Sequence, residues 1–158
     1  MTKTVVDTSV LVSLLESKGP NSKARELLGR LRQEGGLFIN PVVYGELAAS
    51  FESKDTLDNF LSETNLKVEA INQRTAYLAG RKYLEYLENR GERTQCPSCG
   101  SKNEIQCRNC EETIKKRKNI SSDFMIGSHA ELQADRLATY DSDFKTEYFS
   151  DLNIVPSN

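Results

Sequence analysis

Residues 4–9, with the sequence TVVDTS, decide the expected fold, because a short β-branched run stops at an acidic residue and an amphipathic segment follows directly. Valine and threonine favour strands, whereas the apolar residues of segment 10–15 recur at helical spacing. A strand that leads into a helix is the unit from which α/β proteins are built. The carboxyl ends of parallel strands share one edge of the sheet, where ligands usually bind. Asp7 is therefore expected at such an edge.

Three further acidic residues lie where apolar segments begin or stop, namely Glu46, Asp123 and Asp141. We expect Glu46 on a helix, about one turn inside it, and Asp141 after the strand 137–139. Two carboxylates about 4 Å apart repel by roughly 4 kcal/mol at an effective dielectric constant of about 20, and a divalent cation removes that repulsion. These three residues and Asp7 are therefore predicted to form a site for a divalent metal ion.

Short apolar strands alternate with amphipathic helices along the rest of the chain. The expected strands lie near residues 3–6, 37–39, 66–70, 137–139 and 153–155. The first expected helix carries the apolar residues of segment 10–15, the next two begin after residues 22 and 40, and the others cover 56–63, 73–89 and 121–133. Asn40 and Pro41 supply a cap and a first-turn proline for the helix that carries Glu46. The helix 73–89 should pack through one apolar stripe, formed by Ala76, Ala79, Gly80, Tyr83 and Leu87. Right-handed crossovers favour a parallel arrangement, so we expect an α/β protein with a parallel sheet of about five short strands flanked by helices.

All four cysteines lie in one short segment as two C-x-x-C pairs, Cys96 with Cys99 and Cys107 with Cys110. This spacing can offer four thiolates to a tetrahedral zinc ion and leaves no open coordination position, which predicts a structural site. The segment 92–112 has almost no large apolar residues, so it would fold only around its metal. We therefore expect one domain, residues 1–158, that contains a zinc-binding insertion. Two disulfides are the alternative and would fit a secreted protein better.

Bulk composition limits the classes of partner. The chain has 158 residues and a formal net charge of −2, which argues against binding of nucleic acid through overall charge. A nucleic-acid partner would have to be held by local basic groups and by metal. The longest apolar stretch, residues 10–15, is too short to cross a membrane or to direct export. We therefore expect a soluble, cytoplasmic protein with no membrane partner.

The order and spacing of the acidic motifs resemble those of PIN-domain nucleases, most closely the toxin subunits of VapBC toxin–antitoxin pairs. Residues 5–9 look like the first strand and first acid of that family, and residues 40–46 like the helix with the second acid. Residues 122–127 look like the third acidic motif, and residues 137–144 like the last strand with its terminal acids. The cysteine insertion departs from the commonest toxin pattern.

The resemblance implies a three-layer PIN-like fold and a metal-dependent endoribonuclease. In such an enzyme Asp7, Glu46, Asp123 and Asp141 would hold one or two Mg²⁺ or Mn²⁺ ions, with Asp143 as a fifth candidate ligand. Oxygen ligands suit these hard cations, and the activated water would hydrolyse an RNA phosphodiester bond. The resemblance also implies inhibition by a small antitoxin protein and pairing of the toxin as a homodimer.

Each acidic motif has a simpler interpretation when it is taken alone. Asp7 and Asp123 stand among residues that often cap helices. Asp141 and Asp143 fit a solvated turn, and a glutamate such as Glu46 commonly faces solvent. Two other functions therefore stay open: a non-catalytic RNA-binding module that contains zinc, and a PIN nuclease of ribosomal-RNA maturation.

Other polar residues have less specific signals. The hydroxyls of Thr8, Ser9 and Thr139 could orient carboxylates or metal-bound water, or they could cap helices and pack in the sheet. The basic run 115–118, with the sequence KKRK, could contact RNA phosphates, and a solvated helix face explains it equally well. We assign no role to His129, the only histidine.

Overall fold

A computed structural model describes residues 1–17, 22–89, 94–95, 99, 101–114, 121–141 and 147–156. Within these ranges five parallel strands form one sheet in the order β3-β2-β1-β6-β7. The strands are β1 (Thr2–Val6), β2 (Gly35–Ile39), β3 (Leu66–Val68), β6 (Arg136–Ala138) and β7 (Ile154–Val155). The expected α/β fold with a parallel sheet of about five strands is therefore confirmed. A separate antiparallel pair joins β4 (Thr94–Gln95) to β5 (Lys102–Asn103).

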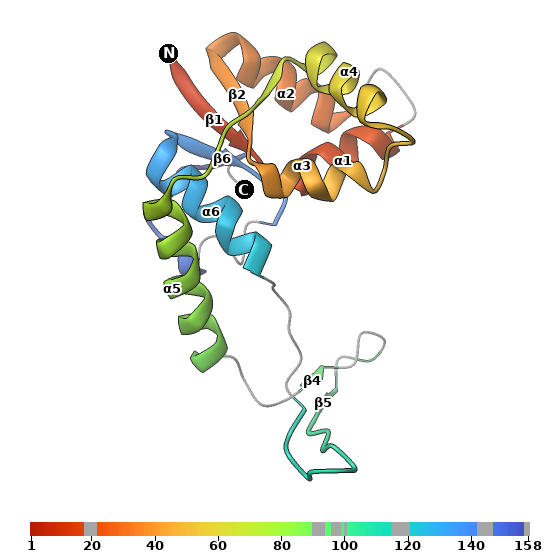
Figure 1. The fold of residues 1–158 in the computed structure, drawn as a ribbon, viewed down its shortest axis with the longest axis vertical. Helices are drawn as coiled ribbons and strands as arrows, with labels where there is room; N and C mark the ends of the chain where they lie inside the picture. The colour runs from red at the N-terminus through yellow and green to blue at the C-terminus, as the bar shows by residue number, and fades with distance from the viewer. Residues whose placement is uncertain are drawn as a thin grey trace.

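Helices cover the sheet and connect its strands. They are α1 (Thr8–Glu16), α2 (Lys23–Glu34), α3 (Pro41–Ala48), α4 (Lys54–Thr64), α5 (Gln73–Asn89) and α6 (Ser121–Gln133). Helix α2 packs on β2, whereas α6 packs on β1 and β6 and also contacts α3. Figure 1 shows α1 to α4 gathered on one side of the molecule and α5 lying alongside α6 on the other. Among the described helices, none combines the length and the apolar content needed to cross a bilayer.

The start of α3 is fixed by the residues that the sequence predicts. Asn40 follows β2 directly, and its side chain accepts hydrogen bonds of 3.0 Å from the N–H groups of Val42 and Val43. Pro41 occupies the first turn, where a missing N–H costs nothing. These local signals set the distance of Glu46 from the carboxyl edge of the sheet.

The hydrophobic core has two parts. The larger part lies between the sheet and helices α1 to α4, and Ile126 and Ala130 of α6 complete it. The smaller part is an aromatic cluster that joins α5 to α6 through Tyr86, Phe124 and Phe149. Because α6 contributes to both parts, the position of its first turn depends on the whole core.

The buried face of α5 differs from the expected stripe. Ala76 and Gly80 are exposed, whereas Thr75 and Tyr86 are buried. The Tyr86 ring lies 5.6 Å from that of Phe124, and burial of two large rings outweighs burial of an alanine and a glycine. The expected stripe was therefore wrong at these positions.

Candidate functional site

Asp7 is a buried acid at the carboxyl edge of the sheet. Its backbone N–H donates to the carbonyl of Ala138 over 2.9 Å, which continues the pairing of β1 with β6. The side chain is 6% exposed and accepts hydrogen bonds from Thr139 Oγ1 over 2.5 Å and from Ser9 Oγ over 2.9 Å. Among the described residues no lysine, arginine or histidine forms an ion pair with it. A carboxylate buried among hydroxyls is well placed to accept a cation.

The turn after β6 is tied to Asp7 by two hydroxyls. Thr139 Oγ1 accepts a hydrogen bond of 3.0 Å from the N–H of Asp141. Ser9 Oγ accepts one of 3.1 Å from the N–H of Tyr140. The prediction that Asp141 follows a strand is confirmed. The side chain of Asp141 is exposed, and the Thr139 hydroxyl connects the Asp141 N–H to the Asp7 carboxylate.

Glu46 lies on α3, in its second turn, and is half-buried. Its Oε2 accepts a hydrogen bond from Thr8 Oγ1. Thr8 directly follows Asp7, so the Thr8 side chain connects Glu46 to the end of β1. Helix α3, which carries Glu46, contacts both α1 and α6.

Asp123 lies in the first turn of α6 and is half-buried. Helix α6 packs on β1, β6 and α3, the three elements that bring Asp7, Asp141 and Glu46 to this part of the molecule. Within the described ranges, no three acidic, histidine or cysteine side chains converge closely enough to form a metal group. What the structure brings together is Asp7 with the hydroxyls of Ser9 and Thr139, and Glu46 with that of Thr8.

Three of the predicted sites lie wholly or partly outside the described residues. They are the candidate ligand Asp143, the zinc ligand Cys96 and the basic run 115–118.

The described half of the cysteine segment forms a tight turn. Cys107 and Cys110 lie in one turn that the N–H of Glu111 closes by donating to the carbonyl of Cys107 over 2.9 Å, and the N–H of Cys107 donates to the carbonyl of Glu112 over 2.9 Å. The N–H groups of Asn109 and Cys110, together with the Cys110 side chain, lower the pKa of the Cys107 thiol. Neither Cys107 nor Cys110 takes part in a disulfide within the described ranges. The zinc site itself stays a prediction from the C-x-x-C spacing.

His129 has a structural role that the sequence did not indicate. The side chain is fully buried on α6, and its Nε2 lies 2.9 Å from Glu69 Oε2. Burial lowers the pKa of His129, although the neighbouring carboxylate acts in the opposite direction. Burial alone would raise the pKa of Glu69, but hydrogen bonds from Lys3 and His129 give it a net lower pKa. This network joins β1, the end of β3 and α6, and a single histidine in an unremarkable helix gave no signal for it.

Comparison with known proteins places the geometry in context. A family model described as "PIN domain" matches residues 4–148. The chain is similar to one in the crystal structure of VapBC2 from Rickettsia felis bound to a DNA fragment from their promoter, at 18% identity, with 96% of each chain covered and a TM-score of 0.59. It is also similar to one in the structure of VapBC-1 from nontypeable Haemophilus influenzae, at 15% identity, with 96% of each chain covered and a TM-score of 0.61. No curated protein sequence matches the chain.

Proposed function

This chain belongs to the PIN domain family, and on that premise we propose that it is a metal-dependent endoribonuclease that acts as the toxin of a VapBC-type pair. Membership of this family leads us to expect nuclease activity. The likeness of fold to chains of two VapBC structures supports the toxin assignment. The observation that carries the proposal is the buried carboxylate of Asp7, held by hydroxyls at the carboxyl edge of the sheet.

The proposed ligands of the metal come from four elements. Asp7, Glu46, Asp123 and Asp141 would hold one or two Mg²⁺ or Mn²⁺ ions, and Asp143 is a further candidate. All offer carboxylate oxygens, which these hard cations prefer. When bound, such ions supply the Lewis acidity and the charge neutralisation that hydrolysis of a phosphodiester requires.

The residues of the chain hold these carboxylates in place. Thr139 fixes the Asp7 carboxylate and the backbone of Asp141 at the same time, because its hydroxyl donates to one and accepts from the other. Thr8 orients Glu46 by donating to its carboxylate. His129 is buried against Glu69 and is therefore not available as a base.

The proposal extends to partners and to the insertion. A small antitoxin protein would cover the acidic site, and two copies of the chain would form a homodimer. The insertion 92–112 would be a structural zinc module within the single domain 1–158, with Cys96, Cys99, Cys107 and Cys110 as ligands. About one zinc per chain by elemental analysis would support this module. Four cysteines that resist thiol reagents until a reductant is added would indicate disulfides instead.

The nuclease function is tested by removing single charges. We expect purified protein with Mn²⁺ or Mg²⁺ to cut single-stranded RNA, and Asp7→Asn or Asp123→Asn to cut none while retaining the melting temperature. Asp151→Asn is the matched control, because Asp151 is exposed and precedes β7, toward the other edge of the sheet. Equal cleavage by the wild type and by both site variants would exclude this site. Binding of RNA without any metal-dependent cleavage would favour the non-catalytic module.

A further inference from the structure

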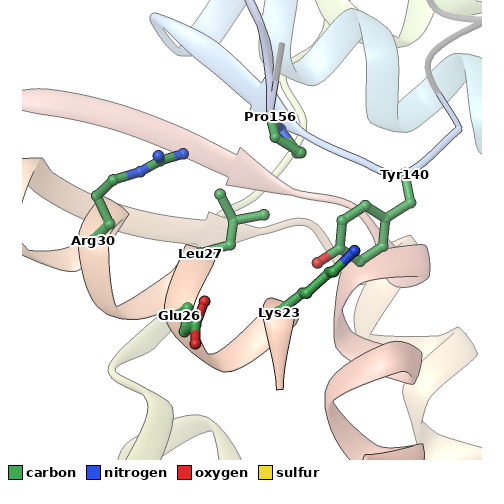
Figure 2. Close-up of a pocket in the computed structure, with 6 residues that line it drawn as sticks. All are labelled: Lys23, Glu26, Leu27, Arg30, Tyr140 and Pro156. Carbon is green, nitrogen blue, oxygen red and sulfur yellow. The ribbon is translucent and has the colours of Figure 1, made fainter. Parts of the chain in front are cut away.

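A cavity lies between α2 and the chain segments that follow β6 and β7. Its volume is about 330 Å³, near the lower end of the range of small-molecule sites, roughly 300 to 1,000 Å³. The described residues that line it are Lys23, Glu26, Leu27, Arg30, Tyr140 and Pro156. Figure 2 shows the Tyr140 ring beside the Lys23 side chain, with Leu27 between them and Arg30. We call this cavity the α2 pocket.

The walls of the α2 pocket combine an aromatic ring with two cations. Lys23 and Arg30 are two helical turns apart on α2, which separates their backbones by about 10 Å along the axis. Neither forms an ion pair within the described ranges, and each carries the positive charge that attracts an anion. Leu27 lies between them in sequence and is 6% exposed, which gives the pocket an apolar floor. Glu26 adds a carboxylate, which can accept hydrogen bonds.

The α2 pocket is connected to the acidic site through Tyr140. The Tyr140 side chain is 40% exposed and lines the pocket, while its backbone N–H donates to Ser9 Oγ, which itself donates to Asp7. Asp141 is the next residue. A group bound against the Tyr140 ring would therefore contact the residue that directly precedes Asp141.

We propose that the α2 pocket binds one unpaired base of the RNA next to the bond that is cut, with the base against Tyr140 and the adjoining phosphates at Lys23 and Arg30. Unpaired bases are recognised by stacking on aromatic rings and by hydrogen bonds to their edges. Glu26 can accept such a bond from an N–H group of the base. The proposal rests on the RNA-cleaving function proposed above and adds a subsite that positions the substrate.

The chemistry favours RNA over an inhibitor peptide as the occupant. A chain with a net charge of −2 needs local cations to hold a polyanion, and this pocket supplies two beside the acidic site. Grooves that take the apolar face of an amphipathic helix are themselves hydrophobic, whereas Leu27 and Pro156 are the only aliphatic side chains among the described lining residues.

The test measures binding in the absence of cleavage. A fluorescently labelled single-stranded RNA of six nucleotides is titrated with the full chain in buffer without added Mg²⁺ or Mn²⁺, and its anisotropy is followed. We expect Tyr140→Ala to weaken binding on the order of tenfold through loss of stacking, and Tyr140→Phe to stay within about twofold of the wild type. Lys23→Ala and Arg30→Ala should each reduce the slope of log affinity against log salt by roughly 0.7.

Matched controls come from the same helix. Arg25→Ala and Arg32→Ala remove the same charge from α2, but these side chains line a different hollow, beside Leu14 and Glu63. They should bind RNA within about twofold of the wild type, and all variants should melt at the wild-type temperature, since all these positions are exposed.

The outcomes separate this proposal from the nuclease proposal. If cleavage depends on Asp7 but the pocket variants bind RNA like the controls, the subsite is excluded and the nuclease stands. If the pocket variants lose affinity as described while no metal-dependent cleavage is found, the subsite stands and the nuclease does not. Unchanged RNA affinity together with weaker binding of a co-expressed inhibitor protein would make the pocket a protein-docking surface and overturn the proposal.

Discussion

At the scale of single residues, the hydroxyl of Thr139 controls the proposed site. It donates to Asp7 over 2.5 Å and accepts from the N–H of Asp141 over 3.0 Å, so one atom orients a carboxylate and a turn. Groups that orient metal ligands typically contribute about 10- to 100-fold in metal affinity or activity. Thr139 is therefore a positioning residue.

Replacing Thr139 by valine tests this role, because the shape is kept and only the hydroxyl is lost. We expect Thr139→Val to lower RNA cleavage by roughly 10- to 100-fold and to raise the Mn²⁺ concentration needed for half-maximal activity. Thr139→Ser should restore both. A valine variant with an unchanged Mn²⁺ requirement would show that the hydroxyl only packs in the sheet.

His129 makes stability depend on pH. Its pKa in the folded chain is lower than the ordinary value of 6.5 because it is buried. The unfolded chain therefore binds a proton more readily, and stability falls as pH decreases below about 6.5 toward the folded pKa. In this window the slope can approach about 1.4 kcal/mol per pH unit.

Urea unfolding at a series of pH values between 8 and 5 measures this dependence. His129→Gln keeps an N–H donor for Glu69 but does not titrate, so its stability should change less between pH 7 and 5.5 than that of the wild type. Parallel curves for the two proteins in that interval would contradict the assignment. Glu69 titrates at lower pH because its pKa is depressed, and it does not interfere.

At the scale of elements, α6 depends on one close contact. A Cβ atom added at Gly127 would lie 2.5 Å from the ring of Phe149, which is 1% exposed. Overpacking of this kind typically costs about 1 to 3 kcal/mol. The contact allows α6, which carries Asp123 in its first turn, to approach the chain before β7.

Two glycine-to-alanine substitutions in helices distinguish the effect of this contact on stability from the effect of helix propensity. We expect Gly127→Ala to lower the free energy of unfolding by about 1 to 3 kcal/mol. Gly80→Ala on α5 has open space around its Cβ and should raise it by roughly 0.5 to 1 kcal/mol. Denaturation in urea measures both changes. Stabilisation by both substitutions would show that Phe149 moves aside without cost.

The sequence could predict features that depend on neighbouring residues in the chain, and it could not predict those that depend on tertiary contacts. The start of α3 at Asn40 and Pro41 was predicted, because cap residues act on the next few N–H groups. The packing of α5 through Tyr86 was not, because its ring partners come from α6 and from residues 147–149. The order of the acids predicted which elements carry them. The contact between Thr139 and Asp7 depends on the register of β6 against β1, which no local pattern encodes.

At the scale of the whole molecule, the acids and the substrate have the same sign of charge. The chain carries a net charge of −2, and the proposed site gathers carboxylates where RNA must approach. Two charges about 4 Å apart repel by roughly 1 kcal/mol in water and by roughly 4 kcal/mol at an effective dielectric constant of about 20. In metal-free solution each carboxylate of the site should therefore weaken the binding of RNA, although the same carboxylates would be required for cleavage with metal.

Removing one charge should then have opposite effects on binding and on cleavage. In buffer with about 0.1 M salt and without added Mg²⁺ or Mn²⁺, we expect Asp7→Asn and Asp123→Asn to bind single-stranded RNA about fivefold more tightly than the wild type, which corresponds to about 1 kcal/mol. In Mn²⁺ the same variants should cut none of it. Asp151→Asn removes an equal charge toward the other edge of the sheet and should change neither property, because salt screens charges beyond about 10 Å at 0.1 M. If both site variants bound RNA more weakly than the wild type without metal, the carboxylates would be contacting RNA or supporting the fold, and they would not form an anionic metal site.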